Sequence, residues 1–364
     1  LWEFTDGDMG LSYSTPQIVP IGLATASPQN FAVFFGNGYN NPNNKSVLYA
    51  VNPQTGVVIK KIDLCAAVSG ACNSTLPQGL SNVATANNNG LQTTSITHVY
   101  AGDLQGNLWS VDVSNSNPAS WTVRLLFQAR TSTGAVQAIT TAPVVTLNPN
   151  YPRYQGLFVM VGTGQLLTSA DLLTTQTQTL YGVWDKPATT TTYLRSNLQA
   201  QTLSTVNTAS SGFTNTILTA TTNTVNWITN VGWYIDLAVG GQRIVTNPNL
   251  VNKAFIATVN TPPLAVCGVG FNSLLLELNY ATGGAFTTPV LDLNGDGKFT
   301  TADQYNGTYA VGVSISNNYS TAPIILGPNK NGNLVILITQ SNGFQTAVIN
   351  PNSTPRKTGW WEIQ

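Results

Sequence analysis

The sequence has little charge. Among its 364 residues, 14 are Lys or Arg, 14 are Asp or Glu and one is His, so 8% are charged and the formal net charge is zero. In an ordinary soluble domain about a quarter of the residues are charged. So few cations exclude a basic surface for nucleic acid, and so few Glu and Lys residues exclude a coiled coil. We expect Thr and Asn to supply most of the water-facing side chains.

Long apolar runs are also missing. None approaches the ~18 residues that a membrane-spanning helix needs, and no basic amphipathic helix is evident, so membrane insertion is not expected. Yet 42% of the residues are hydrophobic, which offsets the entropy of ordering the chain and excludes disorder. The chain begins at Leu1 without a charged and apolar leader. We therefore expect an internal fragment whose targeting signal lies upstream.

Cysteine is scarce, with three residues in the chain. Cys65 and Cys72 bound a short loop of small residues that lets them approach, so the spacing is compatible with a disulfide or with two separate thiols. A disulfide would indicate an oxidising compartment. Cys267 is left over and is interpreted as a small buried hydrophobic residue.

Short apolar runs rich in Val, Ile, Leu and aromatic residues recur along the chain, and most end at Gly, Asn or Pro. This pattern predicts β-strands. The clearest runs are 31–35, 47–51, 108–112, 157–161, 274–278 and 334–338. Helical periodicity with caps is absent, which excludes a parallel sheet built from βαβ units. The sequence therefore predicts an all-β protein.

A loose repeat runs through the first half of the sequence. An apolar run that ends in a Gly-containing turn precedes a strand of the form aromatic, small, Val, as in Tyr49-Ala-Val51, Trp109-Ser-Val111 and Tyr181-Gly-Val183. Repeated hairpins at long period indicate a modified β-propeller of about seven blades, with residues 1–364 as a single domain. Loop insertions are expected at 37–45 and 188–224. A large β-sandwich is the alternative.

One segment fits the twelve-residue calcium loop. It runs from Asp292 to Asp303, with oxygen-bearing residues at the ligand positions and Gly297 at the sharp turn in position six. The predicted ligands are Asp292, Asn294, Asp296, the carbonyl group of Lys298, Thr300 and Asp303. A ligand set made only of oxygen suits Ca²⁺ and not zinc. Asp303 is shorter than the Glu usual at position twelve, which would change affinity or selectivity. The alternative is a metal-free acidic turn.

No catalytic constellation is evident. His98 is the only histidine and lies on a predicted strand, where it is interpreted as a structural residue, and a hydrolase triad is missing. Asp6 and Asp8 are interpreted as a turn with a side-chain cap, and Trp360 and Trp361 as packing residues. We therefore expect no enzymatic activity.

Several longer strings are distinctive. They are Leu1-Trp-Glu-Phe-Thr-Asp-Gly-Asp8, Phe35-Gly-Asn-Gly-Tyr-Asn-Asn41, Leu48-Tyr-Ala-Val-Asn-Pro-Gln-Thr-Gly56, Tyr100-Ala-Gly-Asp-Leu-Gln-Gly-Asn-Leu-Trp109, Leu180-Tyr-Gly-Val-Trp-Asp185, Gly232-Trp-Tyr-Ile-Asp236, Gly241-Gln-Arg243, residues 262–267 and Gly359-Trp-Trp-Glu362. Together they resemble the C-terminal propeller of the PilC/PilY family of type IV pilus biogenesis factors and tip-associated adhesins. The resemblance spans essentially the whole chain.

The resemblance implies a modified β-propeller in the C-terminal part of a larger secreted protein, exported through the periplasm to the pilus tip or outer membrane. It implies a non-enzymatic role in pilus extension against retraction, twitching motility and attachment, under calcium control. The expected partners are pilin or minor pilins and a host-cell or surface receptor. Family members often carry an acidic calcium loop where residues 82–90 here have no carboxylate. Residues 292–303 are therefore the remaining candidate for the calcium site that the resemblance implies.

Two other functions are compatible with the sequence. Residues 49–56 also resemble the repeats of quinoprotein propellers, dehydrogenases that hold pyrroloquinoline quinone with Ca²⁺. The further Trp in each blade and the axial acids of those enzymes are not found. A carbohydrate-binding propeller is compatible with a role in attachment.

Overall fold

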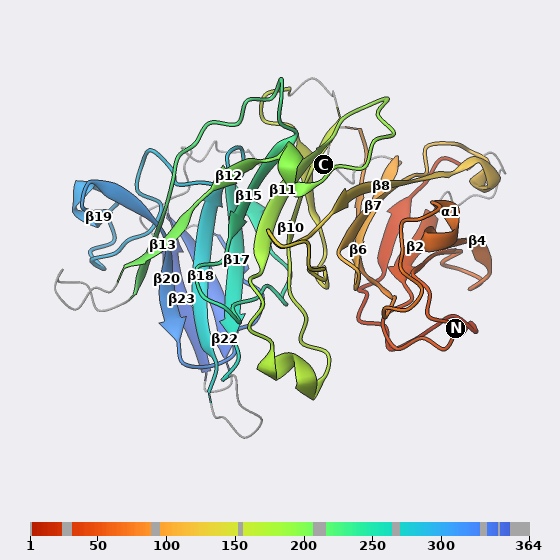
Figure 1. Ribbon diagram of the computed structural model, residues 1–364, viewed down its shortest axis with the longest axis horizontal. Helices are drawn as coiled ribbons and strands as arrows, with labels where there is room; N and C mark the ends of the chain where they lie inside the picture. The colour runs from red at the N-terminus through yellow and green to blue at the C-terminus, as the bar shows by residue number, and fades with distance from the viewer. Residues whose placement is uncertain are drawn as a thin grey trace, which may run out of the picture.

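The protein is built from a series of β-sheets (Figure 1). The computed structural model describes residues 2–23, 31–88, 95–151, 156–206, 216–263, 270–327, 333–340 and the backbone of 343–349. Within these ranges helix is limited to α1 (Leu64–Ala67) and 3-10 turns at Pro118–Ser120, Ser169–Leu173, Arg195–Asn197 and Thr301–Asp303. No helix in the described ranges is long and apolar enough to cross a membrane. The prediction of an all-β protein is confirmed.

The described strands form five sheets. Sheet 1 has the order β1 (Gln17–Pro20), β2 (Phe31–Gly36), β3 (Val47–Val51), β4 (Val58–Asp63). Sheet 2 has the order β5 (Leu80–Ala86), β6 (His98–Asp103), β7 (Asn107–Asp112), β8 (Thr122–Gln128). Sheet 3 has the order β12 (Gln199–Gln201), β15 (Gly232–Asp236), β11 (Thr179–Asp185), β10 (Leu157–Gly162), β9 (Val144–Leu147).

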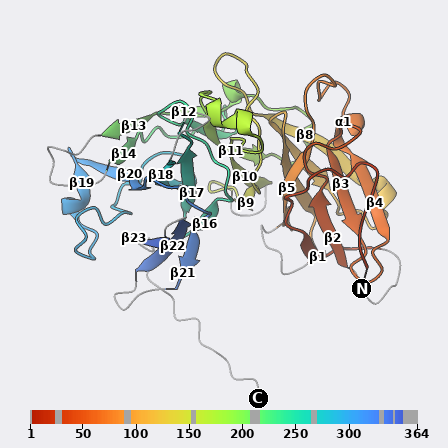
Figure 2. The same cartoon turned by 90° about the horizontal axis from the view of Figure 1, so that it is seen from below.

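The last two sheets come from the second half of the chain. Sheet 4 has the order β13 (Leu203–Val206), β14 (Ile217–Ala220), β20 (Thr308–Ser316), β18 (Asn272–Asn279), β17 (Ala254–Thr261), β16 (Asn249–Val251), and β19 (Gln304–Tyr305) pairs with β20. Sheet 5 has the order β21 (Ile324–Leu326), β22 (Leu334–Gln340), β23 (Gly343–Ile349). Figure 2 shows sheets 1 and 2 at one end of the molecule and sheets 4 and 5 at the other, with sheet 3 between them.

An apolar layer lies between each pair of successive sheets. Representative buried pairs are Phe34 with Trp109 (sheets 1 and 2), Phe127 with Tyr181 (sheets 2 and 3), Trp233 with Phe255 (sheets 3 and 4) and Ile256 with Ile338 (sheets 4 and 5). Sheets that pack one after another in chain order are the blades of a propeller, whereas a sandwich has two sheets around one core. The propeller is therefore confirmed. The described residues form five sheets, and the predicted count of about seven blades is not confirmed.

The three copies of the sequence repeat occupy the same place in three successive sheets. Each copy forms the second and third strands counted from the first strand of its sheet: β2–β3, β6–β7 and β10–β11. The aromatic residue of each copy lies opposite the residue before a glycine: Tyr49 opposite Phe35, Trp109 opposite Ala101 and Tyr181 opposite Val161. The repeat therefore encodes one strand register, used three times.

The glycine in each copy lies where the chain enters the next sheet. A Cβ at this position would approach atoms of the entering segment far more closely than packed atoms do. The distances would be 2.4 Å from Gly36 to the Ser81 carbonyl oxygen, 2.2 Å from Gly102 to Ile139 Cγ2, and 2.6 Å from Gly162 to Ile244 Cβ. The absent side chain lets one blade lie directly against the next.

The two predicted insertions differ in structure. Residues 37–45 form a loop fixed by Asn side chains, and Asn37 Nδ2 donates to the carbonyl oxygens of Asp8 and Lys45, both at 2.9 Å. The described part of 188–224 instead supplies β12 to sheet 3 and the edge hairpin β13–β14 to sheet 4. Leu203 and Leu218 of this segment are buried in the layer between these sheets. The Thr-rich segment therefore contains strands that its composition does not indicate.

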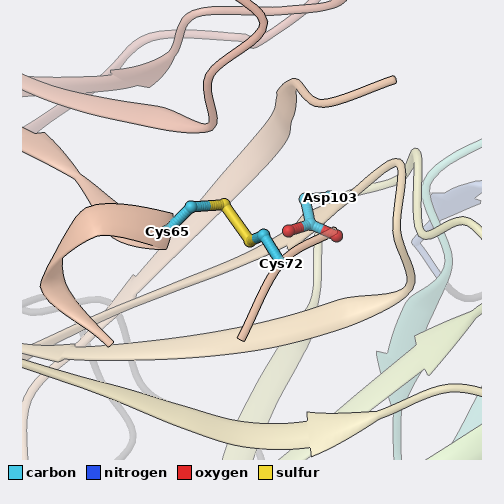
Figure 3. Close-up of side chains that lie close together, drawn as sticks. All are labelled: Cys65, Cys72 and Asp103. Carbon is cyan, nitrogen blue, oxygen red and sulfur yellow. A yellow bond between two sulfur atoms is a disulfide. The ribbon is translucent and has the colours of Figure 1, made fainter. Parts of the chain in front are cut away.

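Cys65 and Cys72 form a disulfide, with their Cα atoms 5.5 Å apart (Figure 3). The bond closes the segment that leads from β4 to β5, and so from sheet 1 to sheet 2. Of the two arrangements compatible with the spacing, the structure has the disulfide. Cys267, Trp360 and Trp361 lie outside the described residues.

Candidate functional site

The predicted calcium loop leaves sheet 4 after β18 and returns to it through β19 and β20. Just before the loop, Val290 and Leu291 are buried in the apolar layer between sheets 4 and 5. These two residues fix the start of the loop, whereas Asn294 and Asp296 are exposed. The first five predicted ligands therefore lie in a surface loop on a packed base, and the sixth, Asp303, is buried.

Backbone N–H groups organise the first half of this loop. Asp292 Oδ1 accepts from the N–H of Gly295 and Asp292 Oδ2 from the N–H of Gly297, both at 2.8 Å. Asn294 and Asp296 each accept the N–H two residues further on, at 2.9 and 2.8 Å. Gly297 has φ +75°, in the left-handed region that favours glycine. The Gly at position six therefore makes the sharp turn that the spacing predicts.

Asp303 closes the second half of the loop. Its Oδ1 accepts from the N–H of Leu293 and its Oδ2 from the N–H of Thr300, both at 2.9 Å. Its side chain is buried, at 1% exposure. Asn333, just before β22, donates through Nδ2 to the carbonyl oxygen of Gly297 at 3.1 Å. The loop is thereby tied to itself and to sheet 5.

The loop has acceptor capacity to spare. A carboxylate offers about four lone-pair sites, and the bonds above use two at Asp292, one at Asp296 and two at Asp303. The donor atoms are all oxygen, as Ca²⁺ prefers. Among the described residues, the only group of three His, Cys, Asp or Glu side chains with ligand atoms within 4.8 Å of one another lies at the disulfide. The loop carboxylates are more widely spaced than that.

The group at the disulfide does not have the chemistry of a metal site. Figure 3 shows its members, Cys65, Cys72 and Asp103. The two sulfur atoms are bonded to each other, and a metal site of this type needs free thiolates. Asp103 is therefore close to the sulfur atoms because the segment closed by the disulfide packs against the turn after β6.

The turn after β6 is built around Asp103. This carboxylate is fully buried and accepts from the backbone N–H groups of Gln105 and Asn107, both at 2.9 Å. It also accepts from Asn107 Nδ2 at 3.0 Å and from Trp109 Nε1 at 2.9 Å. Burial raises the pKa of Asp103, and these hydrogen bonds oppose the rise. These hydrogen bonds explain the spacing of Asp103, Asn107 and Trp109 in the sequence.

Asp6 and Asp8 form the predicted turn, in which Asp6 Oδ1 accepts from the N–H of Asp8 at 2.8 Å. They also form an ion-pair cluster. Lys61 Nζ lies 2.6 Å from Asp6 and 2.7 Å from Asp8, and Lys45 Nζ lies 3.4 Å from Asp8. The hydrogen bond from Lys61 lowers the pKa of Asp8 to about 2, against the effect of burial. The cluster fixes the N-terminal segment on sheet 1, where Phe4 packs.

A cavity of about 470 Å³ with a mixed polar and apolar lining lies between sheets 2 and 3, and it was not predicted from the sequence. On its wall Asp185 Oδ2 accepts from Tyr100 Oη and Ser110 Oγ, both at 2.7 Å, and Oδ1 accepts from Arg124 Nη1 at 2.6 Å. Arg124 also donates to the carbonyl oxygen of Thr191 at 2.8 Å. Asp185 belongs to β11 and its three donors belong to β6, β7 and β8, so the cluster joins two sheets.

A second polar row lies beside this cluster on sheet 2. His98 is opposite Asp112, and Asp112 is opposite Thr122; all three line the cavity. The signal for such a face was the alternation of polar with buried apolar residues along β6, β7 and β8. His98 also has structural contacts, because its Nδ1 lies 2.9 Å from Thr97 Oγ1 and its ring stacks on Tyr100 with centroids 5.9 Å apart.

Comparison with known proteins places these features in context. Residues 4–216 match the family model described as the PilY1 beta-propeller domain. A type IV pilus biogenesis factor PilY1 of Pseudomonas aeruginosa is 30% identical over 100% of the chain, which covers 33% of that protein. A PilY1 homolog of Xylella fastidiosa is 27% identical over 98% of the chain and 25% of that protein. The chain therefore spans a third or less of these relatives' length.

A solved structure is also similar. The crystal structure of the Pseudomonas aeruginosa PilY1 C-terminal domain matches with a TM-score of 0.77 at 27% identity. The match covers 95% of this chain and 73% of that structure. The similarity therefore extends through all five described sheets.

Proposed function

The chain belongs to the PilY1 β-propeller family, and from this premise we propose that it is a non-enzymatic domain that supports type IV pilus biogenesis and binds Ca²⁺ at residues 292–303. The names of the relatives, type IV pilus biogenesis factors, support the pilus role. The geometry of the loop supports the calcium role.

The observation that carries the calcium proposal is a preorganised loop whose carboxylates keep unused lone pairs. Three carboxylates within twelve residues repel one another, and a divalent cation offsets that repulsion. Asp292 and Asp296 would supply carboxylate oxygens, and Asn294 and Lys298 would supply an amide and a backbone carbonyl oxygen. Asp303 already closes the loop, so its shorter side chain serves this role whether or not it contacts the ion.

Calcium in this loop would have a structural effect. The loop is anchored in the layer between sheets 4 and 5 and is bonded to Asn333 beside β22. An ion that holds the loop in one conformation therefore stabilises the junction of the last two blades. We infer that calcium supports the pilus role by ordering this end of the propeller.

The proposal extends to location and partners. The domain would act outside the cell, at the pilus tip or outer membrane, with pilin or minor pilins as partners and a host-cell or other surface as the target of attachment. Only 8% of the residues are charged, so contacts would depend on hydrogen bonds rather than electrostatic steering. Association should then depend weakly on salt.

Calorimetric titration of the purified chain with Ca²⁺ tests the metal site. Asp296→Asn keeps the oxygen that accepts from the N–H of Lys298 and removes the charge of the spare oxygen, so we expect at least tenfold weaker binding. Glu3→Gln is the matched control, because it removes one exposed carboxylate that has no contact with the loop. Absence of calcium binding by the unmodified chain, or equal binding by Asp296→Asn, would refute the calcium site.

A separate experiment tests the pilus role. In the bacterium that carries the gene, removal of the segment that encodes this domain should reduce pilus number, twitching and attachment. Re-expression of the intact protein should restore them. Unchanged pilus number, twitching and attachment would count against the pilus role, whatever the calcium titration shows.

A further inference from the structure

We propose that the cavity between sheets 2 and 3 binds an uncharged saccharide unit. The proposal concerns a different site from the calcium loop and depends on neither calcium nor the pilus role. The cavity measures about 470 Å³, within the range of roughly 300–1,000 Å³ typical of small-molecule sites. It therefore has room for one or two sugar rings.

The polar row on sheet 2 has unused hydrogen-bonding capacity. Asp112 Oδ1 accepts from the N–H of Ser114 at 2.8 Å, and its other oxygen has no partner in the described part of the chain. No described cation pairs with Asp112. His98 Nε2 and the Thr122 hydroxyl also lack partners among the residues that the structure describes. A charged acceptor, an imidazole nitrogen and a hydroxyl are thus available side by side.

The segment from Lys186 to Thr192 forms another wall of the cavity. The ammonium group of Lys186 lies 5.4 Å from the centroid of the Trp184 ring, which packs in the layer between sheets 3 and 4, so this ammonium group is directed away from the cavity. Thr189 and Thr190 belong to the same wall. The cavity therefore has two Thr residues on one side and the carboxylate of Asp112 on the other.

The cavity has one carboxylate without a cationic partner. Asp185 neutralises Arg124 at 2.6 Å, which leaves Asp112 as the unpaired charge. An anionic ligand would lose its hydration here and be repelled by Asp112. A sugar hydroxyl group can donate a charge-assisted hydrogen bond to Asp112, and a neighbouring hydroxyl can bond to Thr122 or His98. A neutral ligand rich in hydroxyls therefore satisfies this polar row.

The remaining features of the cavity fit a sugar ring. Val68, Leu157 and Pro187 place apolar surface among the polar groups, as a ring with C–H faces and hydroxyl edges requires. The wall is also rigid, because the bonds of Asp185 hold sheet 3 to the three strands that carry the polar groups. A preorganised wall reduces the entropy lost on binding.

The test uses the purified chain on an array of neutral and acidic glycans, followed by calorimetry with the best free oligosaccharide. We expect saturable binding of a neutral saccharide. Asp112→Asn, which keeps the Oδ1 acceptor for Ser114, should weaken it at least tenfold. Thr190→Phe should do the same by filling the cavity.

The matched controls are Glu3→Gln for the lost charge and Thr205→Phe for the enlarged side chain, since Thr205 is exposed on the edge strand β13. Both should bind as the unmodified chain does. All variants should keep their melting temperature and calcium response, which separates loss of the cavity from loss of the fold. The proposal is overturned if no neutral saccharide binds, if acidic glycans bind more tightly, or if the cavity variants bind as well as the controls.

Discussion

Two acidic turns in this chain use the same kind of hydrogen bond with different results. Asp103 is fully buried and its carboxylate accepts four N–H groups. Asp292 and Asp296 also accept backbone N–H groups, but both have contact with solvent and unused lone pairs. The local pattern is therefore shared. Burial and the number of donors separate an acid that stabilises the fold from one that is able to bind a cation.

The largest difference should appear when each acid is removed. Asp103→Ala leaves buried N–H groups without acceptors, including Trp109 Nε1, so we expect a loss of about 3–5 kcal/mol in the free energy of unfolding. Asp292→Ala, without calcium, should cost less than about 1 kcal/mol because water replaces its bonds. Urea denaturation measures both variants. Equal losses of unfolding free energy in the two variants would show that burial does not separate the roles of the two turns.

Calcium should act on one turn and not on the other. At a free concentration of one hundred times Kd, an ion that binds only the folded chain adds about 2.7 kcal/mol to its stability. In NMR spectra, the amide signals of Gly295 and Gly297 should shift on calcium binding, while the amide signal of Asn107 is unchanged. Chelation should reverse the effect. A shift of the Asn107 signal to the same degree would mean that calcium changes the structure of the whole molecule and not of the loop.

The strands were predictable where they are buried on both faces. The runs at 47–51 and 157–161 became β3 and most of β10, because a strand between two apolar layers is a continuous apolar run. The segment that forms the hairpin β13–β14 was predicted as an insertion, because it is rich in Thr, Ser and Asn. Three of the four residues of β14 are nevertheless buried. Composition therefore reveals strands made of continuous apolar runs and gives little signal for short strands in a Thr-rich segment.

The calcium loop and the cavity also differ in how far they could be predicted from the sequence. The loop 292–303 is one contiguous segment, so its residue spacing was enough to predict which residues lie together. The cavity combines side chains from β6, β7, β8 and β11. The alternation along β6, β7 and β8 indicates one polar face of sheet 2, but it does not show that β11 of the next sheet packs against this face. That packing depends on long-range contacts, which a single sequence does not show.

Glu277 on β18 extends the comparison to a buried acid without donors. It is 1% exposed, and neither carboxylate oxygen has a hydrogen-bond partner in the described structure. Burial raises the pKa of Glu277 well above its ordinary value of 4.5. The unfolded chain ionises above pH 4.5 while the folded chain resists ionisation, so this residue lowers stability as pH rises.

Glu277→Leu should therefore stabilise the chain at pH 7 by about 1–2 kcal/mol. The gain should shrink as the pH falls below 4.5, where both states carry the neutral acid. Urea denaturation at pH 4 and pH 7 measures it, and Glu277→Gln shows how much of the pH dependence belongs to ionisation. A variant that is less stable than the unmodified chain at pH 7 would indicate that the carboxylate has a stabilising partner.

The smallest effect is expected at Asp8, an acid that is paired with cations instead of backbone donors. Lys61 lowers the pKa of Asp8 to about 2 from an ordinary value of 3.8. The stabilisation is therefore complete above pH 3.8 and is lost as the pH falls towards 2. We expect Asp8→Asn to cost about 1 kcal/mol at neutral pH, since the partly exposed Lys61 is screened by solvent, and to cost nothing near pH 2.

Urea denaturation of both chains between pH 2 and 7 measures this convergence, with Glu3→Gln as the control for the loss of one charge. A high salt concentration should reduce the cost at neutral pH, because the ammonium group of Lys61 has contact with water at 35% exposure. The same salt should leave the cost of Asp103→Ala unchanged, since its donors are neutral and buried. Parallel pH profiles for Asp8→Asn and the unmodified chain would show that hydrogen bonds from Asn43 and Lys61, rather than ionisation, account for what Asp8 contributes.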